Sequence, residues 1–248
     1  MDKDLRRIVL FDCEGHRLVG TLNEAPGTTG VLIVSGGNEI RCGAHRGMAL
    51  LAQRLAMADV PVFRFDRRGI GDSEGTNGGY ATSAPDIASA LAAFRREQPH
   101  IARAIGFGNC DAATALALGG DELDSLVLAN PWLGDEDATP PPVAMRAYYA
   151  RRLLDPSAWR TIFSRGLSFK VSDLRNMLGR PREQPLARQI TDALRQRPVT
   201  IVLASGDRTA QVFAAAVPVP GAIRIDTASH SFAGHLGDLE RVLLAATR

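Results

Sequence analysis

The sequence predicts an α/β fold, with a mostly parallel central sheet covered by helices on both faces. Strand-like and helix-like segments alternate at short spacing, which is the pattern of parallel strands joined by crossover helices. The segment 30–34 is almost entirely apolar, as expected for a strand that is buried on both sides. With 45% hydrophobic and 23% charged residues among 248, the composition is that of a globular chain.

The individual elements follow from local patterns along the chain. Apolar runs on either side of the turn 12–15 predict a hairpin at the start. Ser83, with Asp86 three residues on, is typical of a helix start. The expected strands are 6–11, 16–22, 30–34, 60–65, 102–107, 125–129, 199–205 and 222–225, and further helices are expected over 44–58, over 112–118 and around 236–243.

Residues 131–196 interrupt this alternation of strands and helices. The segment contains both tryptophans and a run of three prolines. We therefore expect a core built from residues 1–130 and 197–248, with 131–196 inserted as a mainly helical lid over the carboxyl edge of the sheet. Aromatic walls favour apolar ligands, so these side chains either line a pocket for an acyl group or form the lid's own core: Trp132, Tyr148, Tyr149 and Trp159.

Composition limits the partners and the compartment of the protein. The 29 basic and 27 acidic residues leave a net charge of +2, which gives no reason to expect a nucleic-acid partner. Three widely spaced cysteines without a Cys-x-x-Cys pair argue against a zinc site and against a disulfide framework. No apolar stretch approaches the ~20 residues that cross a bilayer. We expect a cytoplasmic protein with no membrane span, no metal and no cofactor.

The strongest indication of chemistry is Gly108-Asn109-Cys110-Asp111-Ala112, where a strand meets a helix. A nucleophile on so sharp a turn needs small residues two positions before and after it, because the strand and the helix approach closely. Gly108 and Ala112 meet this need around Cys110. The pattern is the Gly-x-Ser-x-Gly elbow with cysteine as the nucleophile, although a small buried cysteine in tight packing gives the same pattern.

An elbow nucleophile needs an acid and then a histidine later in the chain. Asp207 and His230 occur in this order, each just after one of the last two expected strands. Both should therefore lie at the carboxyl edge of the sheet, where open α/β sheets bind ligands. His235 is the alternative base, and Asp226 and Asp238 are alternative acids.

The oxyanion hole of such a site needs two backbone N–H donors beside the nucleophile. One donor is expected from Asp111, and the other from Asn38, because the glycines before it let the loop turn inward. Gly37 and Arg41 of the same loop are also expected near the substrate. The segment 66–73 lacks the Gly-x-x-x-x-Gly-Lys pattern of a phosphate loop, and we interpret it as a structural support for the site.

These motifs together resemble the α/β-hydrolase superfamily, near its serine-aminopeptidase-like and monoglyceride-lipase-like branch. More narrowly, the chain is similar to the exosortase A system-associated hydrolase 1 family. The matching stretches are Arg41–Arg46, Phe65–Gly75, Asn109–Ala113, Leu128–Trp132, Tyr148–Leu153 and Ser205–Ala210. The resemblance implies an α/β-hydrolase fold, a cysteine at the elbow, and a place in a bacterial exopolysaccharide and protein-sorting system.

The sequence thus predicts an enzyme that cleaves an ester, thioester or related acyl bond of a small molecule. Cys110 would attack the carbonyl, His230 would transfer the proton, and Asp207 would orient the histidine. Two alternatives remain at this stage. The same triad could transfer the acyl group to an acceptor other than water, or the fold could serve a binding protein without catalysis.

Overall fold

The computed structural model describes residues 6–134 and 185–248. Every expected strand is present, with its bounds shifted by at most two residues. The elements are β1 (Arg6–Cys13), β2 (His16–Asn23), β3 (Thr29–Val34), η1 (Ala44–Arg46), α1 (Gly47–Met57), β4 (Val62–Phe65), η2 (Gly79–Thr82), α2 (Ala84–Glu97), β5 (Arg103–Asn109), α3 (Asp111–Gly119), β6 (Ser125–Ala129), α7 (Pro185–Ala193), β7 (Val199–Ala204), α8 (Arg208–Ala216), β8 (Ile223–Ile225) and α9 (Leu236–Ala246).

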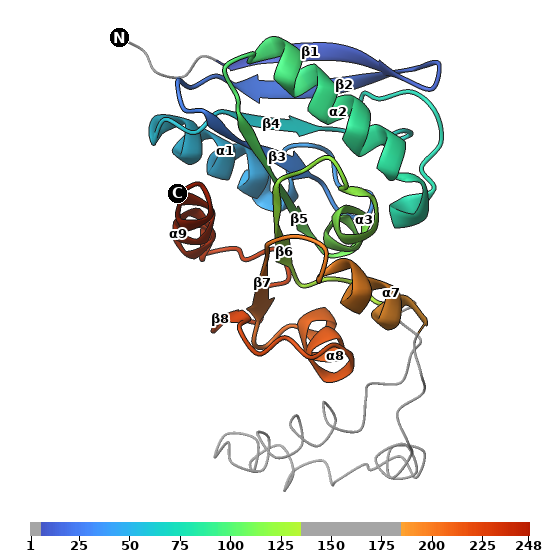
Figure 1. Cartoon of the computed structure of the whole chain (residues 1–248), viewed down its shortest axis with the longest axis vertical. Coiled ribbons are helices and arrows are strands. Elements are labelled where there is room, and N and C mark those ends of the chain that lie inside the picture. The colour runs from blue at the N-terminus through green and yellow to red at the C-terminus, as the bar shows by residue number, and fades with distance from the viewer. Residues whose placement is uncertain (1–5, 135–184) are drawn as a thin grey trace, which may run out of the picture.

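The described strands form a single sheet in the order β1-β2-β4-β3-β5-β6-β7-β8. The pairs β1–β2 and β2–β4 are antiparallel, and all the other pairs are parallel. Figure 1 shows the strands fanning from β1 at one end to β8 at the other. The predicted mostly parallel sheet is confirmed.

Helices cover both faces of this sheet, as predicted. In Figure 1, α1 and α9 lie on one side, and α2, α3, α7 and α8 lie on the other. The side chains of β3 explain its continuous apolar run, since alternate residues enter opposite cores. Val31 and Ile33 pack with α1 and α9, while Leu32 and Val34 pack on the α2 side.

The predicted lid, residues 131–196, lies mostly outside the described residues. Its last part forms α7, and there Ala187 and Ile190 are buried in the core that also contains α3 and α8. This end of the segment therefore packs with the body of the protein. The helical lid itself stays a prediction.

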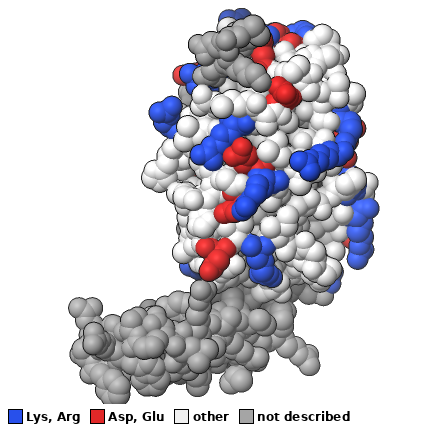
Figure 2. Space-filling view, turned by 90° about the vertical axis from the view of Figure 1, so that its left-hand side faces the viewer, with Lys and Arg blue, Asp and Glu red and all other residues white. Residues whose placement is uncertain are grey.

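The surface in Figure 2 carries both signs of charge. Lysine and arginine side chains are interspersed with aspartate and glutamate among uncharged residues on this face. That distribution agrees with the small net charge of +2. Within the described part, no helix has the length and hydropathy needed to cross a membrane.

Candidate active site

Cys110 lies on the sharp turn between β5 and α3. Its backbone angles, φ 61° and ψ −127°, are strained for a residue with a side chain, and such strain is concentrated at functional sites. A Cβ atom at Gly108 would lie 2.8 Å from the carbonyl carbon of Ala112, so the close approach of strand and helix requires glycine there. The Cys110 N–H donates to the Ala129 carbonyl at 3.0 Å, which ties the turn to the end of β6.

Asp207 and His230 meet at the carboxyl edge of the sheet. Asp207 Oδ1 lies 3.0 Å from His230 Nδ1, and Asp207 Oδ2 accepts the Ala210 N–H at 3.0 Å as the N-cap of α8. Because the helix fixes one oxygen, the other is held toward the imidazole. The Cys110 side chain lies close enough to the His230 imidazole to raise its pKa. The structure thus links Cys110, His230 and Asp207 in one series.

Two neighbours of His230 stabilise its protonated form. The hydrogen bond to the Asp207 carboxylate is the larger cause and the interaction with the Cys110 side chain is the second, and they raise the pKa of His230 to about 10. The imidazole therefore has a strong tendency to hold a proton taken from the neighbouring thiol.

The alternative histidine belongs to a different pair. His235 Nδ1 lies 2.9 Å from Asp238 Oδ2, and Asp238 also pairs with Arg241 on the same helix, α9. These residues are a local cluster at the start of α9. The geometry favours Asp207 and His230 over His235 and Asp238.

Two asparagines that the sequence analysis did not single out hold the main chain of His230. Asn109 Nδ2 and Asn130 Nδ2 donate to the His230 carbonyl at 3.1 and 3.2 Å. Asn130 is fully buried, and its Oδ1 accepts the Ala204 N–H at 2.9 Å. The only signal in the sequence was that Asn109 is the last residue of one strand and Asn130 follows the next, at the same edge of the sheet. A contact between residues 100 positions apart has no local pattern.

The loop after β3 reaches the elbow, as predicted for an oxyanion loop. A Cβ at Gly36 would lie 2.6 Å from the Asn109 carbonyl oxygen, which shows how closely the two segments pass. The N–H groups of Asn38 and Asp111 have no acceptor among the described residues. The Gly37 N–H, in contrast, donates to the Asp111 carboxylate. That side-chain contact was not anticipated.

Arg67 explains how a carboxylate is accommodated beside the nucleophile. Its Nη2 atom lies 3.0 Å from Asp111 Oδ2 and 2.8 Å from the Gly37 carbonyl, and its Nη1 atom lies 3.0 Å from Ser83 Oγ. The Arg67 side chain is only 2% exposed, so its charge is offset chiefly by Asp111. The segment 66–73 therefore supports the loop after β3 through Arg67, which contacts the Gly37 carbonyl.

Among the residues expected near the substrate, Arg41 lies away from the triad and Trp132 lies beside it. The Arg41 guanidinium pairs with Asp66 and Asp72 and bonds Thr21, so it anchors its loop to β2 and is not brought to the triad. Trp132 lies beside the elbow, because its N–H donates to the Cys110 carbonyl at 3.3 Å. The other expected pocket residues, Tyr148, Tyr149 and Trp159, lie outside the described residues.

Comparisons with known proteins identify the family and the fold. The model of the Alpha/beta hydrolase family matches residues 31–243. A search of curated proteins found no match. An esterase of Pyrococcus furiosus is 15% identical with a TM-score of 0.64, covering 97% of this chain and 89% of its own. A serine hydrolase homologue of Coxiella burnetii is 15% identical with a TM-score of 0.61, covering 97% of this chain and 96% of its own.

A third solved structure, a serine hydrolase without a lid from Xanthomonas campestris, is 15% identical with a TM-score of 0.59, covering 97% of this chain and 92% of its own. At these identities, the solved structures establish a shared fold. The family model covers most of the chain, from within β3 into α9, and so includes the elbow and the segments after β7 and β8 that contain Asp207 and His230. The chain belongs to the alpha/beta hydrolase family.

Proposed function

We propose that the protein hydrolyses an ester, thioester or related acyl bond with Cys110 as its nucleophile. The observation that carries the proposal is that His230 lies between Cys110, which helps to raise its pKa, and Asp207, to which it is hydrogen-bonded at 3.0 Å. A nucleophile in contact with a base, which is in turn oriented by an acid, is the arrangement that acyl transfer requires. The esterase and serine hydrolases of the same fold support this reaction class.

The first half of the reaction forms an acyl-enzyme. The Cys110 thiol gives its proton to His230, and the sulfur attacks the substrate carbonyl carbon. When the tetrahedral intermediate collapses, the bond to the leaving group breaks and the leaving group takes the proton from His230. Asp207 holds the proton on Nδ1 and stabilises the imidazolium, in agreement with the raised pKa of about 10.

The second half releases the acid. Water gives a proton to His230 as its oxygen attacks the thioester carbonyl, and collapse of that intermediate returns the proton to the Cys110 sulfur. In both halves the N–H groups of Asn38 and Asp111 stabilise the negative oxygen. Arg67 assists indirectly, because it holds the Asp111 carboxylate and the Gly37 carbonyl in place.

We further propose that the protein belongs to the exosortase A system-associated hydrolase 1 family and acts in the bacterial cytoplasm. The elbow Asn109–Ala113 and the segment Asn130-Pro131-Trp132 support this proposal, because both stretches match that family. In the structure they form one contact network, in which Asn130 bonds Asn109 and Trp132 bonds the Cys110 carbonyl. The two matching stretches are therefore in direct contact with each other in the folded chain.

A panel of p-nitrophenyl esters and acyl thioesters tests the reaction. Wild-type protein should turn over at least one of them, and Cys110→Ala should abolish that turnover while leaving the melting temperature close to that of the wild type. Cys110→Ser is a matched variant, since it keeps the size and hydrogen bond of the side chain. Turnover that survives Cys110→Ala would contradict the proposal.

Two further outcomes would change the assignment. If an added amine or alcohol receives the acyl group faster than water does, the protein is an acyltransferase using the same triad. If the folded protein binds acyl compounds and turns over none, the fold serves a binding protein.

A further inference from the structure

Arg64 is a buried arginine that the proposed reaction does not use. It lies on β4, between Thr21 of β2 and Ile33 of β3, and only 4% of it is exposed. Its Nη1 atom donates to the Arg41 carbonyl at 3.0 Å, and its Nε atom has no hydrogen-bond partner. No carboxylate among the described residues lies within ion-pair distance of it. A buried guanidinium without a counterion is costly and calls for an explanation.

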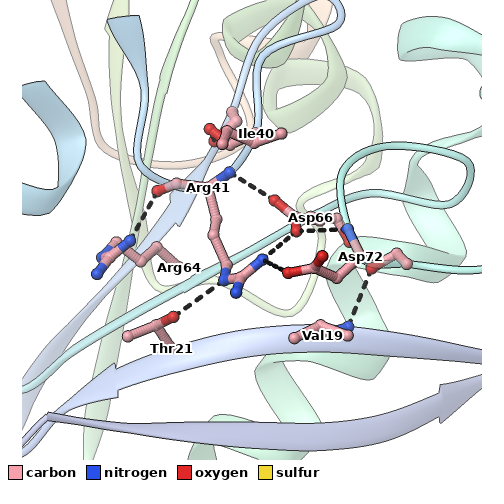
Figure 3. Close-up of polar contacts among 9 residues, drawn as sticks. Val19, Thr21, Ile40, Arg41, Arg64, Asp66 and Asp72 are labelled. Carbon is pink, nitrogen blue, oxygen red and sulfur yellow. Dashed lines mark hydrogen bonds and ion pairs between the residues drawn. The ribbon is translucent and has the colours of Figure 1, made fainter. Parts of the chain in front are cut away.

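Arg64 forms part of the wall of a cleft of about 380 Å³ on the α1 side of the sheet. Figure 3 shows its guanidinium directed away from the ion-paired head of Arg41, so Arg64 interacts with Asp66 only at longer range and forms no ion pair with it. The residues that line the cleft are Arg6, Arg7, Ile8, Thr21, Ile40, Arg41, Cys42, Arg64 and Asp72. None of them belongs to the triad.

The charges around this cleft are unbalanced. The Arg41 guanidinium forms ion pairs with Asp66 and Asp72, the two carboxylates beside the cleft (Figure 3). Arg7 pairs with glutamates on the opposite face of the sheet. Arg6 lies on the same face as Arg64 and repels it. Burial, followed by repulsion from Arg6 and Arg41, lowers the pKa of Arg64 to about 10.

The rim of the cleft is apolar. Ile8 is 56% exposed and Ile40 is 47% exposed, and both line this one cleft, so they present apolar surface to whatever occupies it. An anion attached to a short hydrocarbon group would cover these side chains and neutralise Arg64. An inorganic anion would do only the second.

We propose that this cleft is a binding site for a small organic oxyanion, a phosphate ester or a carboxylate, held by Arg64 and Arg6. Guanidinium groups bind both kinds of oxyanion through charge-assisted hydrogen bonds. The site is separate from Cys110 but shares a loop with it. The loop that carries Gly37 and Asn38 at one end carries Ile40, Arg41 and Cys42 in the cleft at the other. This inference goes beyond the proposed hydrolysis and does not depend on it.

Butyl phosphate, butyrate and inorganic phosphate are suitable probes, each tested on the full-length protein at ionic strength matched with sodium chloride. Isothermal titration should show one site, with butyl phosphate or butyrate bound more tightly than inorganic phosphate because of the apolar rim. The comparison of butyl phosphate with butyrate identifies the preferred oxyanion. The anion should also raise the melting temperature.

The variant Arg64→Met removes the charge and keeps most of the side-chain volume. It should weaken binding by about tenfold or more and remove the shift in melting temperature. The matched control is Arg54→Met on α1, whose arginine is exposed and lies outside the cleft, and this variant should bind as the wild type does. Binding that is unchanged in Arg64→Met, or absent for all three probes in the wild type, would overturn the proposal.

Labelling of Cys42 gives a second measurement that needs no variant. Cys42 lines the cleft, so saturating butyl phosphate or butyrate should slow its alkylation by iodoacetamide severalfold. Labelling of Cys110 should not slow to the same degree. An anion that protects Cys110 and leaves Cys42 unprotected binds at the acyl site, and that result would also overturn the proposal.

Discussion

Replacing Asp207 by asparagine separates the two contacts of this carboxylate. One oxygen caps α8 through the Ala210 N–H, and the other bonds His230 Nδ1, both at 3.0 Å. An asparagine can keep the cap with its Oδ1 atom, but it then turns its Nδ2 donors toward the imidazole. His230 Nδ1 must accept that bond, so the tautomer that the reaction needs is disfavoured.

The expected effect falls mainly on activity. A hydrogen bond to a charged group contributes ~1.5–3 kcal/mol, and the wrong tautomer adds to this loss, so kcat/KM should fall by about 10²- to 10⁴-fold. Asparagine caps a helix about as well as aspartate does, so Asp207→Asn should keep the cap and lose only the stability that the carboxylate gives to protonated His230. That loss should be largest below about pH 6.5 and should disappear as the pH rises through about 10. Asp207→Ala should lose the cap as well, at about 1 kcal/mol, and melt ~2–4 °C lower.

Steady-state kinetics on the best substrate of the panel, with thermal unfolding of each variant, measures both effects. Asp238→Asn is the matched control, because that carboxylate pairs with His235 and should leave kcat/KM unchanged. An Asp207→Asn protein that is folded and keeps more than about a tenth of wild-type kcat/KM would refute the orienting role.

Three further predictions follow from the same geometry. Brief treatment with iodoacetamide at about pH 6 should alkylate Cys110 before Cys42 and remove activity in step, because Cys110 lies beside a histidine that can take its proton, whereas the Cys42 thiol contacts the Gly43 carbonyl. Peptide mass spectrometry measures the order, and labelling of Cys42 before Cys110 would contradict the prediction. Gly108→Ala should lower the free energy of unfolding by ~1–3 kcal/mol in urea, since the new Cβ would lie 2.8 Å from the backbone of α3, whereas Gly221→Ala has open space and should be nearly neutral. The pKa of His230 is raised from 6.5 to about 10, so the stability contributed by its charged form is full below about pH 6.5 and is lost as the pH rises through about 10. The difference in unfolding free energy between the wild type and His230→Gln should therefore shrink between about pH 6.5 and about pH 10. A difference that grows over this range would contradict the assignment.

The fold was predictable because its signals are local. Parallel strands covered on both faces are continuously apolar, and the short helices between them keep a 3.6-residue period. The elbow was equally visible, since a turn as tight as that at Cys110 restricts the residues two positions away. The chain order of nucleophile, acid and histidine then favoured Asp207 and His230, with His235, Asp226 and Asp238 left as alternatives.

Contacts between distant segments were not predictable in this way. Ser83 and Asp86 were expected to form a helix cap, but the Ser83 side chain makes no cap hydrogen bond, and its hydroxyl serves Arg67 and the Gly79 carbonyl. The Asp86 carboxylate forms an ion pair with Arg68, because the half-buried guanidinium requires a counterion. Tertiary demand for charge pairing overrode the local signal.

The Asp111 side chain illustrates the same limit at the site. The sequence assigned Asp111 only a backbone N–H, because position after the nucleophile says nothing about where a carboxylate points. Its contacts with the Gly37 N–H and Arg67 arise from a loop 74 positions away and from a residue 44 positions away. The sequence therefore predicted that segment 66–73 supports the site, but only the structure shows that Arg67 and Gly37 contact the Asp111 carboxylate.

The central claim is that Cys110 carries the acyl group during the reaction. Rapid quenching of the wild-type protein with a thioester or p-nitrophenyl substrate, followed by mass spectrometry of the intact protein and its peptides, tests it most directly. The account predicts one acyl group per chain, attached to Cys110, formed and lost at rates that match turnover, and absent from Cys110→Ala. Turnover without such an adduct, or an adduct on Cys42 that forms at the rate of turnover, would contradict it.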